Sequence, residues 1–279
     1  MVVVGEREGV VMFTGIDTAA RITAAQAEKI KAQGLSFVGR YLVPESYGKA
    51  LTAAEADVLR SAGLAILLCW ELGAEDMKGG AVKGAEHGAR ARRIAESMGV
   101  PSGTAIYFAA DYDVPQKDLP LCEHYLKSAQ TALGKYTAGA YGPRRLVEYL
   151  HDRRLPYKLW QCVAWSDLFI DADDAIQYAW QGSTDAKAMA AKLGFAVDLD
   201  SCLDMRRAGF WMPENVYVGD DETIVEPWYA KDMAWAEANS IMTDGRPEDT
   251  VTRAELATVT HRLYNLVMDD KKYSGLLDD

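Results

Sequence analysis

"AIYFAADYDVP", residues 105 to 115, begins as an apolar and aromatic run and ends in two carboxylates, Asp111 and Asp113. A short apolar run of this kind is typical of a buried strand. Because alternate residues of a strand share one side, we expect Asp111 and Asp113 to project together from the end of this strand. Two charged groups at the end of a buried strand indicate a site at one edge of a sheet.

Seven other segments have the same character as residues 104–113. They are "GVVMFTGID" (9–17), "LSFVGRYL" (35–42), "LAILLCWE" (64–71), "TAGAYG" (137–142), "YKLWQCVAW" (157–165), "AIQYAWQG" (175–182) and "FAVDLDSC" (195–202). Amphipathic stretches with helix signals separate them, and this alternation favours a parallel sheet with helical crossovers.

The helix signals are capping boxes and glycines. Thr23 with Gln26 and Thr52 with Glu55 have the spacing of a box that satisfies the first free amides of a helix. Glycines at 34, 63, 99, 134 and 194 stand where helices are expected to end. Eight such βα units in about 200 residues predict an α/β fold, a (β/α)8 barrel of the TIM type, although an open doubly wound sheet has a similar periodicity.

Polar residues at the ends of these strands favour the barrel, in which they meet at one face. They are Asp17, Arg40, Tyr41, Glu71, Asp111, Asp113, Tyr141, Gln161, Gln181, Asp198 and Asp200. The glycines at 80, 84 and 88 have helical spacing and lack the order of a phosphate-binding loop.

The carboxylates in this group suit cleavage of a glycosidic bond, which needs a protonated acid and a second, ionised carboxylate. We expect Asp17, Asp111, Asp113 and Asp198 to form such a group, with Glu71 as a fifth member. Two alternatives stay open: each acid is a helix cap or turn former, or the group holds a divalent cation. No resident metal or other cofactor is expected.

Aromatic residues near the same ends suit the flat faces of sugar rings. We expect substrate contacts from Tyr41, Tyr141 and Trp165, together with the polar residues Arg40, Gln161 and Gln181. Strand alternation places Trp70 and Trp180 in the core instead.

Composition limits the possible partners. The chain has 279 residues, 49% of them hydrophobic, and a net charge of −11, so neither half has the basic stripe of a nucleic-acid-binding protein. No stretch predicts membrane insertion. The four cysteines show no metal-binding spacing, and we expect reduced thiols in the core.

Several of these motifs together carry a resemblance to a known family. "FTGIDTAARIT", "FVGRYL", "AIYFAADYD", "AGAYG", "YAWQG" and "VDLDSC" occur in this order. Over residues 11 to 210 the chain resembles the glycoside-hydrolase-like barrel domain known as domain of unknown function 1906, which is similar to the family 25 muramidases.

The resemblance implies roles for individual acids. The muramidase pattern falls on Asp17, on Asp111 with Asp113, and on Asp198, and it makes residue 113 the general acid. The muramidases have Glu at that position, so the shorter Asp113 leaves three readings open: a barrel built around Asp, participation of Glu71, or glycan binding without cleavage. A substrate with N-acetyl sugars is also implied, whose acetamido oxygen attacks the anomeric carbon while Asp111 orients it.

The last part of the chain differs in charge. From Pro213 onward 15 acidic residues face 6 basic ones, and we expect a barrel domain over 1–212, a linker over 213–227 and a helical hairpin module over 228–279. This module resembles one surface-layer homology repeat, a module that binds secondary polysaccharides of the cell wall. The resemblance implies a glycan pocket with Arg253, Trp235 and Asp244.

The function expected from the sequence is a cell-wall glycosidase of lysozyme type, independent of metal, that cuts peptidoglycan glycan strands at the bacterial wall. The alternative is a glycan-binding barrel without activity, anchored at the cell surface. The N-terminus shows no secretory signal, which suits a phage endolysin or a mature chain whose leader was removed.

Overall fold

A computed structural model describes residues 12–170 and 174–213 of the chain. They belong to the first of two units into which the chain divides, residues 1–216. The predicted linker and the predicted C-terminal module, with Trp235, Asp244 and Arg253, lie outside the described residues.

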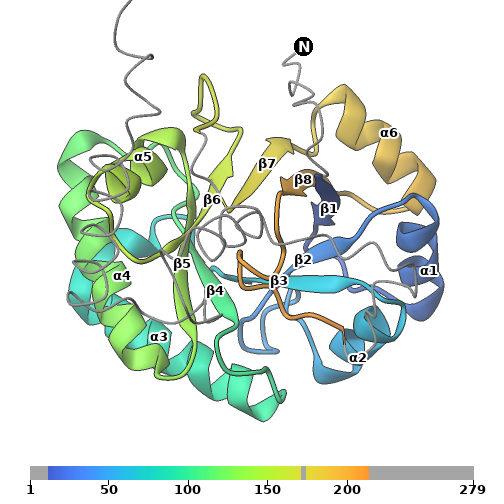
Figure 1. The fold of residues 1–279 in the computed structure, drawn as a ribbon, viewed down its shortest axis with the longest axis horizontal. Coiled ribbons are helices and arrows are strands. Elements are labelled where there is room, and N and C mark those ends of the chain that lie inside the picture. The colour runs from blue at the N-terminus through green and yellow to red at the C-terminus, as the bar shows by residue number, and fades with distance from the viewer. Residues whose placement is uncertain (1–11, 171–173, 214–279) are drawn as a thin grey trace, which may run out of the picture. The chain divides into compact units, whose positions relative to one another are not determined.

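Eight strands form a closed barrel in which each strand pairs with its neighbours in sequence order, and helices lie outside it (Figure 1). The strands are β1 (Phe13–Asp17), β2 (Phe37–Tyr41), β3 (Ala65–Trp70), β4 (Ala105–Ala109), β5 (Thr137–Gly142), β6 (Lys158–Cys162), β7 (Ala175–Ala179) and β8 (Asp198–Cys202). The predicted barrel is confirmed, and all eight predicted segments contain a strand.

The α-helices are α1 (Ala24–Ala32), α2 (Ala53–Ser61), α3 (Gly80–Ser97), α4 (Leu119–Leu133), α5 (Arg144–Asp152) and α6 (Thr184–Leu193), with short 3₁₀ helices at η1 (Asp76–Gly79) and η2 (Gln116–Asp118). The Thr23–Gln26 capping box is formed as predicted. Gly194 ends α6 with φ of 91°, a left-handed conformation that favours glycine.

The regular βα repeat stops at the end of the barrel. In the described part of residues 163–174 no helix follows β6, and β8 runs antiparallel to both β1 and β7. The expectation of parallel strands throughout is therefore wrong for β8. The connection through α6 starts and ends at the same end of the barrel, so Asp198 begins its strand where Asp17 ends its own.

Alternate residues of each strand fill the barrel. Phe37, Leu67, Tyr107, Trp160 and Cys202 pack inside it, whereas the residues between them pack under the helices. Glycines make room for the large rings: a Cβ at Gly139 would lie 2.6 Å from the ring of Tyr107.

The segment after β8 covers one end of the barrel. The ring of Phe210 lies 4.9 Å from that of Phe37, and the Tyr107 hydroxyl donates a hydrogen bond of 2.8 Å to the carbonyl oxygen of Ala208. The opposite end, where β1 to β7 finish and β8 begins, is called the mouth below.

Candidate functional site

Asp17 and Asp198 form a carboxylate pair at the mouth. They stand directly opposite each other in the β1–β8 ladder, so their side chains share one face of the sheet. Gly39 on β2 gives Asp17 its space, because a Cβ at Gly39 would lie 2.6 Å from the Cβ of Asp17. The reversal of β8 thus brings together two acids that lie 181 positions apart in the sequence.

Burial raises the pKa of both acids. The pKa of the Asp17 carboxyl rises to about 7, through burial and then the charge of Asp198. The pKa of Asp198 rises to about 6, mainly through burial; Asp111 raises it further, and a hydrogen bond from the backbone amide of Gln181 to Asp198 Oδ1 opposes the rise. Both groups therefore exchange protons near neutral pH.

Asp111 joins this pair from the loop after β4. Its backbone amide donates a 3.0 Å hydrogen bond to the carbonyl oxygen of Ala74, and its side chain is half-buried. Burial and the charge of Glu71 raise the pKa of Asp111, whereas Lys49 lowers it. Asp111 also acts electrostatically on Asp17 and Asp198, so the three acids belong to one site.

Glu71 reaches the same region but has a cation of its own. Lys49 Nζ lies 3.0 Å from Glu71 Oε2 and 4.1 Å from the centre of the Tyr41 ring. Lys49 is a site residue that sequence reasoning missed, since it follows "ESYG" in a loop where nothing marks it. It supplies a positive charge beside Asp111 and Glu71.

A hydrogen-bonded chain runs from Tyr141 to Asp17. The Tyr141 hydroxyl donates to Gln177 Oε1 at 3.0 Å, and Gln177 Nε2 donates to Asp17 Oδ2 at 2.8 Å. Sequence reasoning missed Gln177, although its place in "AIQYA" between two outward residues marks it as inward-facing. Tyr141 therefore belongs to the site, as a support for Asp17.

Asp113 is not brought together with the other acids. The regular strand ends at Ala109, so the alternation that would align Asp111 with Asp113 no longer holds. The Asp113 side chain is 63% exposed, and its Oδ1 lies 3.2 Å from Arg145 Nη1 on α5. The side chains of Asp111 and Asp113 therefore do not project together as predicted, because both residues lie in the loop after β4.

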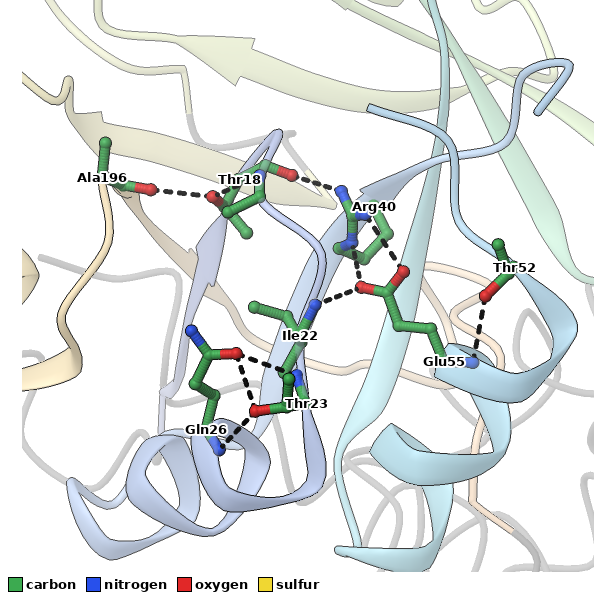
Figure 2. A network of polar contacts seen from close by, with 9 residues as sticks. Thr18, Ile22, Thr23, Gln26, Arg40, Thr52, Glu55 and Ala196 are labelled. Atoms are coloured by element: carbon green, nitrogen blue, oxygen red, sulfur yellow. Dashed lines mark hydrogen bonds and ion pairs between the residues drawn. The ribbon is translucent and has the colours of Figure 1, made fainter. Parts of the chain in front are cut away.

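Arg40 lies outside the barrel wall, where its side chain contacts α2 and the loop after β1. It is 0% exposed and donates from Nε and Nη2 to the carboxylate of Glu55, at 2.8 and 3.2 Å, as Figure 2 shows. Its Nη1 donates to the carbonyl oxygen of Thr18. The predicted substrate contact of Arg40 is therefore corrected, because the even-numbered residues of β2 face the helices.

The predicted substrate contact of Gln161 is wrong for the same reason. Gln161 lies between the inward-facing Trp160 and Cys162 and is buried outside the barrel. Its Nε2 donates to the carbonyl oxygen of Leu168 at 2.7 Å, and its Oε1 accepts from the amide of Ile170 at 3.1 Å. Gln161 thus holds the loop after β6.

Two exposed tryptophans stand on the loops after β6 and β7. Trp165, with φ of 54°, is 49% exposed, and Trp180 is 57% exposed. The expectation that Trp180 is buried is wrong, because β7 ends at Ala179 and Trp180 begins a turn. Trp70 is buried as expected. The side chain of Gln181 is exposed, and its backbone amide donates a hydrogen bond to Asp198 Oδ1.

The thiols, the possible metal ligands and the helix lengths bear on other kinds of site. All four cysteines are free and buried. Within the described residues, no group of three or more His, Cys, Asp or Glu side chains is arranged to hold a metal ion. Across residues 12–170 and 174–213, no helix is both long and apolar enough to cross a bilayer.

Known proteins share this fold. The crystal structure of the Mycobacterium tuberculosis Tat-secreted protein Rv2525c, in complex with L-tartrate, matches with a TM-score of 0.61 and 24% identity, covering 71% of this chain and 98% of that chain. Two uncharacterized proteins of Bacillus subtilis are similar: YbfG is 37% identical over 152 residues and FadG 28% over 156.

These relatives are longer than the matched region. The match with YbfG covers 47% of this chain and 20% of YbfG, and the match with FadG covers 50% of this chain and 26% of FadG. A family model matches residues 28–243, which is most of the chain and includes β2 to β8 but not β1. The chain therefore belongs to the family of the Rv2525c-like, glycoside hydrolase-like domain.

Proposed function

We propose that this barrel is a glycoside hydrolase that cleaves peptidoglycan glycan strands. The observation that carries the proposal is the group of Asp17, Asp111 and Asp198 at the mouth, whose pKa values are all raised. A glycosidase needs one carboxyl group that holds a proton and another that does not, and mutually repelling acids in partial burial provide that difference.

In this proposal Asp198 is the general acid. It is partly exposed, and its pKa of about 6 leaves a protonated fraction near neutral pH. Asp198 donates its proton to the glycosidic oxygen as the bond from that oxygen to the anomeric carbon breaks. Asp17 lies deeper, accepts a hydrogen bond from Gln177 and has the higher pKa of the pair, whereas the charge that raises the pKa of Asp198 is that of Asp111.

Asp111 supports the positive charge that develops on the sugar. With Lys49 nearby to favour its ionised form, the Asp111 carboxylate stabilises an oxocarbenium-like carbon. If the substrate carries an N-acetyl group, the acetamido oxygen forms the new bond to the anomeric carbon while the Asp111 carboxylate accepts a hydrogen bond from the acetamido N–H. Water then attacks that carbon, breaks its bond to the acetamido oxygen and gives a proton to the Asp198 carboxylate, which restores the acid and leaves a sugar with a reducing end.

The aromatic residues fit a sugar chain at the mouth. Tyr41 borders the acids, and the exposed rings of Trp165 and Trp180 stand on adjoining loops. We place a pyranose ring against Trp180, because the next residue, Gln181, bonds to Asp198. The muramidase type of cleavage, at the bond after N-acetylmuramic acid, is part of this proposal.

The place of action follows from the proposed substrate. We locate the protein outside the cytoplasm at the bacterial cell wall, as its relative Rv2525c is Tat-secreted. The tail over 228–279, with Trp235, Asp244 and Arg253, is proposed to bind a secondary wall polysaccharide. Retention of the full chain on purified walls, compared with Arg253→Ala, tests this: equal retention of the two would sink the assignment.

The second candidate is a glycan-binding barrel without hydrolysis. The exposed Asp113, paired with Arg145, favours it, because the residue that resemblance makes the acid is turned away from the other carboxylates. A binder keeps its affinity for glycan when an acid of the mouth is neutralised.

The test is release of reducing ends from purified peptidoglycan in the presence of a chelator, with Asp111→Asn in parallel. We expect release by the parent chain and a loss of about 10²-fold or more in the variant. Absence of release by the parent, with wall binding retained in both proteins, would replace the hydrolase by the binding barrel.

A further inference from the structure

Asp200 is a carboxyl group sealed inside the barrel. It lies on β8, two residues beyond Asp198, and is 0% exposed. Its neighbours across the sheet are Gly15 on β1 and Gln177 on β7. None of the steps proposed above uses Asp200, so its burial needs a separate explanation.

The hydrogen bonds of Asp200 are incomplete for a carboxylate. Its Oδ1 accepts a 3.0 Å bond from Trp160 Nε1, whereas Oδ2 receives no bond from any donor in the described part of the chain. Burial of an ionised carboxylate is unfavourable when one of its oxygens has no hydrogen-bond partner. Asp200 Oδ2 therefore does not fit the role of an ionised acceptor.

Asp17 lies on the same face of the neighbouring strand, one alternation along the β1–β8 ladder, and the two carboxyl groups act on each other's pKa. An ionised carboxylate only accepts hydrogen bonds, so two of them in contact repel. The contact becomes favourable when one of the two keeps a proton. Asp17 already accepts a 2.8 Å bond from Gln177 Nε2, which suits its ionised form.

We propose that Asp200 remains protonated at neutral pH and donates its Oδ2–H to Asp17, which makes it a positioning residue for the carboxylate pair at the mouth. The burial and the position of Asp200 support its protonation whatever the barrel does. The effect of Asp200 on cleavage rests on the proposed function. Asp200 then satisfies both of its oxygens, and Asp17 is held between Gln177 and Asp200.

The charges around Asp200 agree with this assignment. Burial raises its pKa well above the usual value, and Asp17 on β1 and Asp198 on β8 raise it further, while Trp160 on β6 acts in the other direction. Tyr178 on β7 also responds to the charge of Asp200. With two acids as its strongest charged neighbours, Asp200 keeps its proton to higher pH than an ordinary aspartate does.

An asparagine at position 200 would reproduce the proposed bonds. Its amide nitrogen can donate to Asp17, and its oxygen can accept from Trp160, in the same shape. Asp200→Asn is therefore expected to fold and to keep the mouth intact. Asp200→Leu removes both bonds and leaves Asp17 and Trp160 without partners.

The experiment is infrared difference spectroscopy of the full chain at about pH 8, where an ordinary carboxyl is ionised. We expect the parent minus Asp200→Asn difference to contain the C=O stretch of a protonated carboxylic acid. Asp57→Asn, at an exposed position of α2, is the control, and its difference should contain only carboxylate bands. A carboxylate band in the Asp200 difference would overturn the proposal.

The consequence for the site is measured separately. If the parent releases reducing ends, Asp200→Asn should keep its rate within about threefold and Asp200→Leu should lose it by about tenfold or more. Loss in the asparagine variant comparable to that in the leucine variant would contradict the positioning role. If the parent shows no release, the infrared result still decides whether Asp200 holds its proton.

Discussion

At the scale of single residues, the mouth depends on space as well as charge. Gly39 faces Asp17 so closely that any side chain must displace it. Gly39→Ala is therefore expected to destabilise the fold by about 1–3 kcal/mol and to lower activity by at least about tenfold. Urea unfolding and reducing-end release measure the two effects.

Gly48 provides the matched control for this change. It stands in the loop beside Lys49, and a Cβ there meets nothing within 4 Å. Gly48→Ala should leave the unfolding midpoint and the activity near those of the parent chain. Equal behaviour of the two alanine variants would show that Asp17 does not need the space at Gly39.

Trp180 tests the sugar contact next to the acids. Trp180→Ala is expected to weaken glycan binding by about 1–2 kcal/mol, with Trp180→Phe restoring most of it, because a flat ring is what the sugar needs. Tryptophan fluorescence during titration with soluble glycan fragments measures the affinity. An unchanged affinity in Trp180→Ala would place the sugar elsewhere.

The residue scale also shows what sequence could and could not decide. Alternation within β2 and β6 already indicates that Arg40 and Gln161 face away from Tyr41 and Trp160, so these two errors were avoidable. The direction of the Asp113 side chain could not be predicted in this way, because the sequence pattern does not show that the strand ends at Ala109.

At the scale of elements, the buried pair of Arg40 and Glu55 ties β2 to α2 and to the loop after β1. Glu55 Oε1 also accepts from the amide of Ile22 at 2.8 Å, and the Thr18 hydroxyl donates to the carbonyl oxygen of Ala196 (Figure 2). Thr18 follows Asp17, and Ala196 lies two residues before Asp198. The network therefore fixes the segments that carry both acids.

Removing one partner of this ion pair should lower the free energy of unfolding more than removing both partners. Arg40→Met leaves the Glu55 charge buried without its cation, at an expected cost of about 3–5 kcal/mol in unfolding free energy. Arg40→Met with Glu55→Leu should recover part of that loss. Urea denaturation of the three proteins decides this, and a single variant as stable as the parent would refute the structural role of the pair.

The order of elements was largely predictable, but the direction of the last strand was not. Apolar runs and capping signals identify the strands and most helices. Both orientations of β8 bury the same alternate residues, so the pattern in "FAVDLDSC" is the same for each. Only the path of the chain through α6 decides the direction, and that path depends on tertiary packing.

At the scale of the whole molecule, the raised pKa values make stability depend on pH. An unfolded aspartate has a pKa of about 3.9. Folded Asp17 titrates at about 7 and Asp198 at about 6, so the folded state holds more protons between these limits. Stability is then highest in acid and falls as pH rises through this range.

We expect the unfolding free energy to decrease by on the order of 3 kcal/mol between about pH 5 and pH 8. Asp17→Asn should flatten this dependence and be more stable than the parent at the alkaline end. Denaturant unfolding at several pH values measures both slopes. A parent chain whose stability rises over this interval would contradict the raised pKa values.

In the proposed function Asp198, brought to the mouth by the reversed β8, acts with Asp111 on a glycosidic bond. The most direct test of this role is the rate of reducing-end release from peptidoglycan by Asp198→Asn beside Asp113→Asn. We expect a loss of about 10²-fold or more for Asp198→Asn and a change within about threefold for Asp113→Asn. The opposite order, with activity lost at Asp113 and kept at Asp198, would contradict it.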